Sequence, residues 1–196
     1  IYFEGTLGFG GHTLEIFNRL SKKGGIVSTD VDLSAFNYCK EKFKGEDRIK
    51  LYNFNFSLID VIAKIESLEF FDGILADLGV SSFQLDNTAA GFSYSIDTML
   101  DLRLDKSLRK TAADFINYES EEKIANVIFE FGEEKNSRKI ARKISEARKV
   151  KRIETTDELK KIISSVTNPK YLTKTLSRVF QALRIYLNDE LGALTL

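Results

Sequence analysis

The chain has 196 residues, 43% of them hydrophobic and 30% charged, which is the composition of a soluble globular protein with one sizeable core. Its 29 basic residues balance its 29 acidic residues, so the overall charge points to no class of partner. No apolar run is long enough to span a bilayer. The single cysteine, Cys39, excludes an internal disulfide and favours a reducing, cytoplasmic compartment.

Charge is distributed unevenly along the chain. Residues 1–104 carry a net charge of −5, and residues 105–196 carry +5. This asymmetry indicates a second region with a different task.

Residues 1–80 alternate between predicted strands and predicted helices. Strands are predicted at 1–4, 25–30, 49–56 and 74–78. Apolar faces at helical spacing lie between them, around 14–20, 36–43 and 58–68. Strands separated by helices of this length indicate right-handed βαβ units and a parallel sheet.

The strand signal ends near residue 105, and amphipathic helices follow. Apolar faces predict helices over 124–131, 159–166 and 176–187. Thr155 and Glu158 form a capping box before the second of these helices, and Asn168-Pro169 separates the second from the third. The sequence therefore predicts an α/β half followed by helices.

A glycine-rich loop follows the first strand. Gly5, Gly8, Gly10 and Gly11 crowd the turn between this strand and the first helix. Glycine allows a close backbone approach to a ligand, and the helix N-terminus beyond the loop offers free N–H groups. The spacing G-x-x-G-x-G-G differs from the G-x-G-x-x-G of dinucleotide-binding enzymes, which argues against a bound pyrophosphate.

An acid closes the second strand, 19 residues after Gly11. In nucleotide-binding α/β folds an acid at this place accepts hydrogen bonds from ribose hydroxyls, which favours Asp30 as a cofactor ligand. Asp32 is the competing candidate.

Three other residues near these strand ends have both structural and functional interpretations. Strand alternation places Phe54 and Phe56 on one face, where either side chain could pack in the core or against an adenine. His12 is the only histidine, and at a helix start it is more typical of a structural hydrogen bond than of a catalytic base. One histidine and one cysteine disfavour a transition-metal site.

The fourth strand ends in Asp77 and continues at once into a small polar loop that contains Ser81 and Ser82. Ligands of open α/β sheets bind outside the carboxyl ends of the strands, so this element is a second candidate site.

Residues 135–152 contain nine basic side chains against one acid, Glu146. Such a run is either a solvated helix face or a surface that binds nucleic-acid phosphates. The interpretation as an RNA surface singles out Arg138, Arg142 and Lys149.

Several segments resemble the bacterial 16S ribosomal RNA cytosine-N4 methyltransferases, which depend on S-adenosylmethionine. The matching segments occur in the family's order and extend along the chain. They are Glu4-Gly5-Thr6-Leu7-Gly8-Phe9-Gly10-Gly11-His12-Thr13, Asp77-Leu78-Gly79-Val80-Ser81-Ser82-Phe83-Gln84-Leu85-Asp86, Gly91-Phe92-Ser93, Leu100-Asp101-Leu102-Arg103-Leu104-Asp105 and Phe180-Gln181-Ala182-Leu183-Arg184-Ile185.

The resemblance implies a Rossmann-like class I methyltransferase sheet, α/β in class, with an all-helical insertion domain. The family's later strands have no counterpart here, so the sheet is expected to be incomplete. The implied division is an α/β domain over 1–104, a substrate-recognition insertion over 105–175 and a helix over 176–196 that returns to the α/β domain.

The resemblance also implies the site residues. The implied contacts of S-adenosylmethionine are Gly10, Gly11, His12, Asp30, Phe56, Asp77 and Gln84. Asp77 is also a candidate catalytic acceptor, and Ser81 and Ser82 are candidate contacts of the RNA substrate in 16S ribosomal RNA or the small ribosomal subunit. A nicotinamide-dependent oxidoreductase and a non-catalytic RNA-binding protein remain the alternatives.

Overall fold

The computed structural model describes residues 1–79 and 91–194. The chain divides into two compact units, one formed by residues 1–79 and 191–196 and the other by residues 80–190. Each unit has its own layers and its own core.

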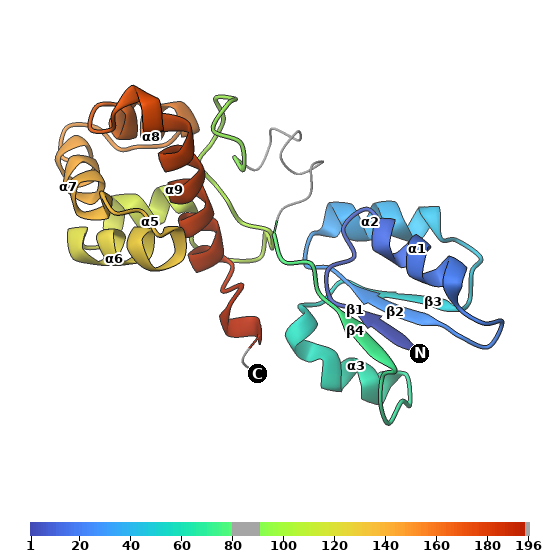
Figure 1. The fold of residues 1–196 in the computed structure, drawn as a ribbon. Helices are drawn as coiled ribbons and strands as arrows, with labels where there is room; N and C mark the ends of the chain where they lie inside the picture. The colour runs from blue at the N-terminus through green and yellow to red at the C-terminus, as the bar shows by residue number, and fades with distance from the viewer. Residues whose placement is uncertain (80–90, 195–196) are drawn as a thin grey trace. The chain divides into compact units, whose positions relative to one another are not determined.

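The α/β unit is built on a four-stranded parallel sheet, which confirms the predicted fold class. The strand order is β3-β2-β1-β4, so the first strand lies inside the sheet and the fourth at one edge. Helices α1 and α2 cover one face and α3 covers the other (Figure 1). The strands are β1 (Tyr2–Glu4), β2 (Ile26–Thr29), β3 (Ile49–Tyr52) and β4 (Gly73–Leu75), and the helices are α1 (Gly11–Arg19), α2 (Leu33–Lys42) and α3 (Ile59–Ile65).

A small apolar core lies between the sheet and α3. Phe3, Val27 and Ile62 are almost fully buried in it, with Phe56 and Phe71 packed against them. The four residues of β2 are all buried, as expected for an inner strand of a parallel sheet covered on both faces.

The third strand is shorter than its apolar pattern predicts. It ends at Tyr52, and the chain then forms a short 3-10 helix, η1 (Phe56–Leu58). Two side-chain hydrogen bonds end the strand, because the Asn53 side-chain amide donates to the Asp30 carbonyl of the neighbouring strand end and the Asn55 side chain accepts from the Ser57 amide. The prediction of one extended strand over 49–56 is therefore wrong at its C-terminal end.

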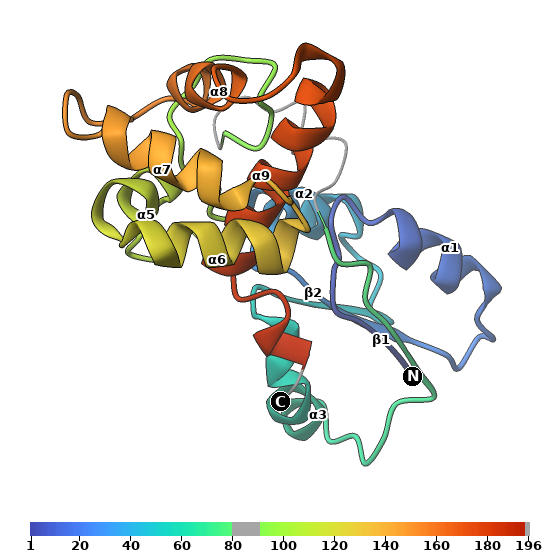
Figure 2. The same cartoon turned by 60° about the vertical axis from the view of Figure 1, so that its left-hand side comes forward.

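The second unit is a helical bundle around a larger core. Figure 2 shows α6 and α7 side by side, with α9 packed against α6. The helices are α5 (Ala112–Tyr118), α6 (Glu121–Gly132), α7 (Ser137–Ala147), α8 (Thr156–Ser164) and α9 (Leu172–Leu187), with the 3-10 helices η3 (Pro169–Tyr171) before α9 and η4 (Gly192–Leu194) after it.

The two helix-end signals that the sequence predicts are both found in the structure. Thr155 and Glu158 form the expected capping box at the start of α8. Asn168 caps the turn with Pro169 that separates α8 from α9. Helix α5 was not predicted, although Thr111 and Asp114 form a second capping box at its start.

The boundary between the two units differs from the division expected from the sequence, which ended the α/β domain at 104 and returned the chain to it at 176. Phe92, Leu100 and Leu102 are buried in the helical core, and so are Val179 and Leu183 of α9. These apolar side chains are buried by packing against the other helices. The segment over 91–104 and the whole of α9 therefore belong to the bundle.

Helices α6 and α9 pack closely at Gly132. A Cβ atom built at Gly132 would lie 2.5 Å from the Arg178 carbonyl oxygen and 3.1 Å from the Ala182 Cβ. The absence of a side chain at Gly132 therefore sets how near the two helices come.

We predict that Gly132→Ala destabilises the helical unit by about 1–3 kcal/mol, because the added methyl group overpacks this crossing. A loss of stability would be informative, because replacing a glycine within a helix by alanine normally stabilises a protein by about 0.5–1 kcal/mol. Urea unfolding followed by circular dichroism measures the change. Asn126→Ala, on the exposed face of the same helix, is the control and should stay within about 0.5 kcal/mol of the wild type.

Candidate cofactor site

The candidate site lies where β1, β2 and β4 end at the same edge of the sheet. The glycine-rich loop leaves β1 there and enters α1. Gly8 and Gly10 have φ angles of 51° and 72°, in the left-handed region that favours glycine. A Cβ atom at Gly10 would also meet the Phe43 ring at 2.6 Å, whereas one at Gly11 would meet nothing within 4 Å. The loop is therefore packed at Gly10 and open at Gly11.

Asp30 fixes the loop to the end of β2. Its carboxylate accepts hydrogen bonds from the Gly8 amide at 2.7 Å and from the Asp32 amide at 2.8 Å. Burial raises the pKa of Asp30, while the two backbone donors act in the opposite direction. Asp30, the residue predicted to bind the cofactor ribose, is thus in direct contact with the glycine-rich loop.

Asp32, the competing candidate, has a structural part. Its side chain caps α2 by accepting from the Ser34 amide at 2.8 Å. Capping of this kind accounts for an acid at a helix start.

Asp77 fixes the other side of the loop. Its backbone amide donates to the Thr6 hydroxyl at 2.8 Å, and the Gly5 amide donates to the Leu75 carbonyl at 2.8 Å. The Asp77 side chain is exposed. Two of the predicted site acids thus lie at opposite sides of one loop.

Helix α2 supports the loop from beneath. The Lys42 ammonium donates to the carbonyls of Phe9 at 2.9 Å and Gly10 at 3.2 Å, and the Cys39 thiol donates to the Gly8 carbonyl at 3.4 Å. Burial raises the pKa of the Cys39 thiol to about 11, so this cysteine is a buried structural residue and not a nucleophile. Sequence reasoning missed Lys42, because only the tertiary fold brings it to the loop.

Phe56 and Phe54 lie in different surroundings, contrary to the strand alternation. Phe56 is partly buried and packs on Gly5, where a Cβ atom would come within 2.8 Å of the Phe56 Cβ. Phe54 is exposed and stacks on the Tyr52 ring with centroids 5.9 Å apart. Of the two rings, Phe56 is therefore the one at the base of the loop.

Glu4 is the most deeply buried acid of the site, and sequence reasoning did not single it out. One carboxylate oxygen accepts from the hydroxyls of Thr13 and Ser28, the latter at 3.0 Å. The other oxygen, Oε1, has no hydrogen-bond partner and lies 4.0 Å from Nδ1 of His12. The signal in the sequence was an acid at the last position of an apolar strand, directly before the glycine-rich loop.

His12 itself is half-exposed at the start of α1. Gln84, Ser81 and Ser82 lie outside the described residues, so their predicted roles remain predictions. Among the described residues no cluster of histidine, cysteine and acidic side chains could hold a metal ion.

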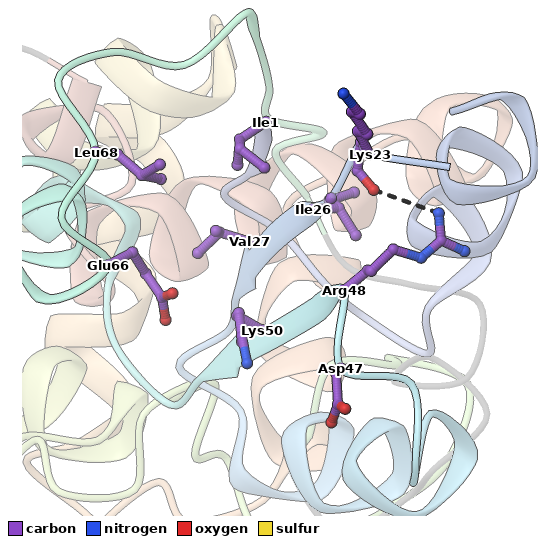
Figure 3. Close-up of a pocket in the computed structure, with 11 residues that line it drawn as sticks. Ile1, Lys23, Ile26, Val27, Asp47, Arg48, Lys50, Glu66 and Leu68 are labelled. Atoms are coloured by element: carbon purple, nitrogen blue, oxygen red, sulfur yellow. Dashed lines mark hydrogen bonds between the residues drawn. The ribbon is translucent and has the colours of Figure 1, made fainter. Parts of the chain in front are cut away.

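A cavity in the described part of the chain lies elsewhere, at the amino ends of the strands. Ile1, Lys23, Arg48 and Lys50 line it, and Arg48 donates to the Gly24 carbonyl at 3.4 Å beside it (Figure 3). Ligands of parallel sheets bind at the carboxyl ends, so this cavity is not the candidate site.

The predicted RNA residues lie on α7 and the turn after it, in the helical unit. Arg138, Arg142 and Lys149 are all exposed, with Arg142 3.9 Å from Glu146. No helix in the described part of the chain is long and apolar enough to cross a membrane.

The glycine-rich loop, the acid after β2 and the acid after β4 define a Rossmann-like α/β protein whose site suits a nucleotide-type cofactor. A sequence model of the MraW methylase family matches residues 1–196. The chain belongs to this family.

Curated relatives carry the name ribosomal RNA small subunit methyltransferase H. The protein from Caldicellulosiruptor saccharolyticus is 44% identical over 192 residues, which cover 97% of this chain and 62% of the relative. Those from Legionella pneumophila (strain Corby) and Fusobacterium nucleatum are 42% and 41% identical, covering 100% and 98% of this chain and 64% and 62% of the relatives. The chain thus spans somewhat less than two thirds of the length of these relatives.

We predict that Glu4→Gln flattens the pH dependence of stability in the α/β unit. Burial raises the pKa of Glu4 above its ordinary 4.5, so the folded state binds this proton more tightly than the unfolded state. The resulting stability is fully present below 4.5 and is lost as the pH rises through the raised pKa.

Urea unfolding at a series of pH values from about 4 to 8 measures this difference. Glu15→Gln removes an exposed acid of α1 and should leave the wild-type profile unchanged. Parallel profiles for the wild type and Glu4→Gln would show that Glu4 does not titrate in this range.

Proposed function

We propose that the protein transfers a methyl group from S-adenosylmethionine to the exocyclic N4 of a cytosine in 16S ribosomal RNA. The observation that carries the proposal is the group of acids at the glycine-rich loop: Asp30 accepts from the Gly8 amide, the buried Glu4 has an unpaired oxygen, and the backbone of Asp77 is bonded to Thr6. A sulfonium and an ammonium group make the methyl donor cationic at its amino-acid end, and carboxylates favour such a ligand. The names of the relatives support the same substrate class.

The residues present fit this cofactor. The space above Gly11 is open, and the unpaired Oε1 of Glu4 is a buried acceptor at the loop. The same acids would repel the pyrophosphate of a dinucleotide, which weakens the alternative of a nicotinamide-dependent oxidoreductase.

Each predicted cofactor residue then has a physical part. Asp30 would accept hydrogen bonds from the ribose hydroxyls, because its two oxygens keep lone pairs beyond those used by Gly8 and Asp32. Gly10, Gly11 and His12 would present the start of α1, and Phe56 would pack against the adenosine. Gln84 and Asp77 would complete the site from the loop after β4.

Bound S-adenosylmethionine supplies an electrophilic methyl group with a neutral thioether as the leaving group. The cytosine N4 is a weak nucleophile because its lone pair is delocalised into the ring. The protein must therefore hold N4 and the methyl carbon about 3–3.5 Å apart and in line. Asp77 would accept a hydrogen bond from the amine and take its proton once the new bond forms, with Ser81 and Ser82 contacting the base.

The helical unit would hold the RNA. Its α7 face carries Arg138, Arg142 and Lys149, whose charges suit phosphate contacts, and we assign substrate recognition to this part of the chain. An exocyclic amine inside a duplex cannot be reached, so the target cytosine must be unpaired or turned out. An enzyme with a substrate in the small ribosomal subunit would act in the cytoplasm.

Calorimetry with S-adenosylhomocysteine and with NADH tests the cofactor class directly. We expect binding of the first and none of the second. Binding of NADH alone would favour the oxidoreductase, and binding of neither, with RNA still bound, would favour a non-catalytic RNA-binding protein.

We predict that Asp30→Ala weakens S-adenosylhomocysteine binding by about 1.5–3 kcal/mol, the usual effect of losing hydrogen bonds to a charged group. Calorimetry measures the dissociation constant. Asp32→Ala is the matched control, because it removes the cap of α2 and should lower stability without this loss of affinity. Equal affinities for a folded Asp30→Ala variant and the wild type would contradict the assignment.

We predict that replacing Arg138, Arg142 and Lys149 together by Gln weakens RNA binding. The log–log dependence of affinity on salt should flatten by about 0.7–0.9 per lost phosphate contact. Fluorescence anisotropy at several salt concentrations measures both quantities.

The control for this triple variant replaces Lys123, Lys161 and Lys170, three exposed lysines outside the α7 face. It removes the same charge and should leave the salt slope closer to that of the wild type. Equal effects of the two triple variants would mean that net charge, not the α7 face, attracts RNA.

A further inference from the structure

An exposed aromatic ring stands at the end of α5 and is held in place. Tyr118 is 75% exposed, yet the Arg152 guanidinium carbon lies 5.0 Å from its ring centroid. Arg152 is itself fixed by a hydrogen bond to Asp114 at 2.8 Å, and it also donates to the Tyr118 hydroxyl. The ring is therefore presented to solvent in one orientation, so little conformational entropy remains to be lost on binding.

Hydrogen bonds attach the end of α5 to the end of the basic run. Arg148 donates to the carbonyls of Ile116 at 2.6 Å and Glu119 at 2.7 Å. The Asn117 side chain exchanges hydrogen bonds with the backbone of Ile153. The end of α5, which carries Tyr118, thus lies beside the C-terminal end of α7 and the turn that follows it.

The surroundings of Tyr118 favour a polyanion. The exposed face of α7 carries Arg138, Lys139 and Arg142, and Lys149 follows in the turn. Four of the neighbouring acids have cationic partners: Asp114 and Glu154 pair with Arg152, Glu119 with Lys110 and Glu158 with Lys151. Glu121 and Glu122, at the start of α6, are exposed acids on the other side of the α5–α6 turn from Tyr118 along the chain.

Among the described residues of this unit, the other exposed aromatic rings lack that combination. Phe129 is 61% exposed on α6, but it lies next to the exposed acid Glu130 and outside the basic run. Tyr171 is 56% exposed in η3, with Lys170 5.6 Å from its ring centroid, but it lies outside the basic run.

We propose that Tyr118 stacks on an unpaired base of RNA whose backbone lies along α7. Base stacking on an aromatic side chain needs one free ring face beside a cationic track, which is what Tyr118 and α7 provide together. The guanidinium of Arg152 keeps the ring in place. The inference rests on the proposed RNA substrate, but it needs neither the methyl donor nor turnover.

Anisotropy with a single-stranded RNA of mixed sequence tests the proposal. Tyr118→Ala should weaken binding by roughly 5- to 150-fold, while Tyr118→Phe should keep most of the affinity because it keeps the ring. The salt slope should not change with either variant, since no charge is lost. Tyr171→Ala, the matched control, should bind as the wild type does.

A tryptophan at the same position gives a second readout. The chain contains no tryptophan, so Tyr118→Trp introduces a single tryptophan, whose emission can be excited apart from that of the tyrosines. RNA should quench its emission, whereas heparin, a polyanion without bases, should not.

The outcomes separate the two proposals. Wild-type affinity for Tyr118→Ala, an equal loss for Tyr171→Ala or an absence of RNA-specific quenching would overturn the stacking role. Failure to bind any RNA would overturn it as well. Failure to bind S-adenosylhomocysteine would instead overturn the proposed methyltransferase activity and leave the stacking result standing.

Discussion

The hydrogen bond from the Gly8 amide to the Asp30 carboxylate is the constraint on which the candidate site depends. It joins the first loop of the sheet to the end of the neighbouring strand, so the loop cannot move away from β2 without breaking a hydrogen bond to a partly buried side chain. Parallel register supplies the rest, because it brings β4 alongside β1 and places Asp77 within reach of Thr6. The site is thus a consequence of strand order, because β1, β2 and β4 end side by side and the glycine-rich loop is bonded to the ends of β2 and β4.

In the helical unit, hydrogen bonds join the end of α9 to the segment over 102–104 in a similar way. Asn188, at the end of α9, donates to the Leu102 carbonyl and accepts from the Leu104 amide. Leu102 has a φ angle of 61°, and Asp101 and Arg103 on either side of it form a two-bond ion pair. The motif over 100–105, which carries part of the family resemblance, therefore has a structural task that accounts for its charged residues.

The sequence was sufficient for the sheet, the order of the elements and the position of Asp30, because hydrophobic period and capping residues are local signals. It was insufficient where the outcome depends on distant partners. The strand expected to reach Phe56 stops at Tyr52, because Asn53 finds the Asp30 carbonyl across the sheet. The segment over 91–104 and α9 joined the bundle because apolar side chains such as Leu100 and Val179 pack there, which periodicity alone does not specify.

The same limit applies to the site. Asp30 and Phe56 could be chosen from position and resemblance, and the structure brings both to the glycine-rich loop. Glu4 required knowledge of its burial, and Lys42 required the fold that carries α2 to the loop carbonyls. A sequence pattern identifies a strand end, but it does not show which side chain supports that end from below.

The thiol beneath the loop has a practical consequence. Cys39 is fully buried and lies against Gly8 and Gly10, so a thiol-modifying reagent can reach it only when α2 separates from the loop. Because the chain has one cysteine, each modification event reports that single opening motion. The rate of labelling therefore measures how often α2 and the glycine-rich loop separate, and it does so without any engineered probe.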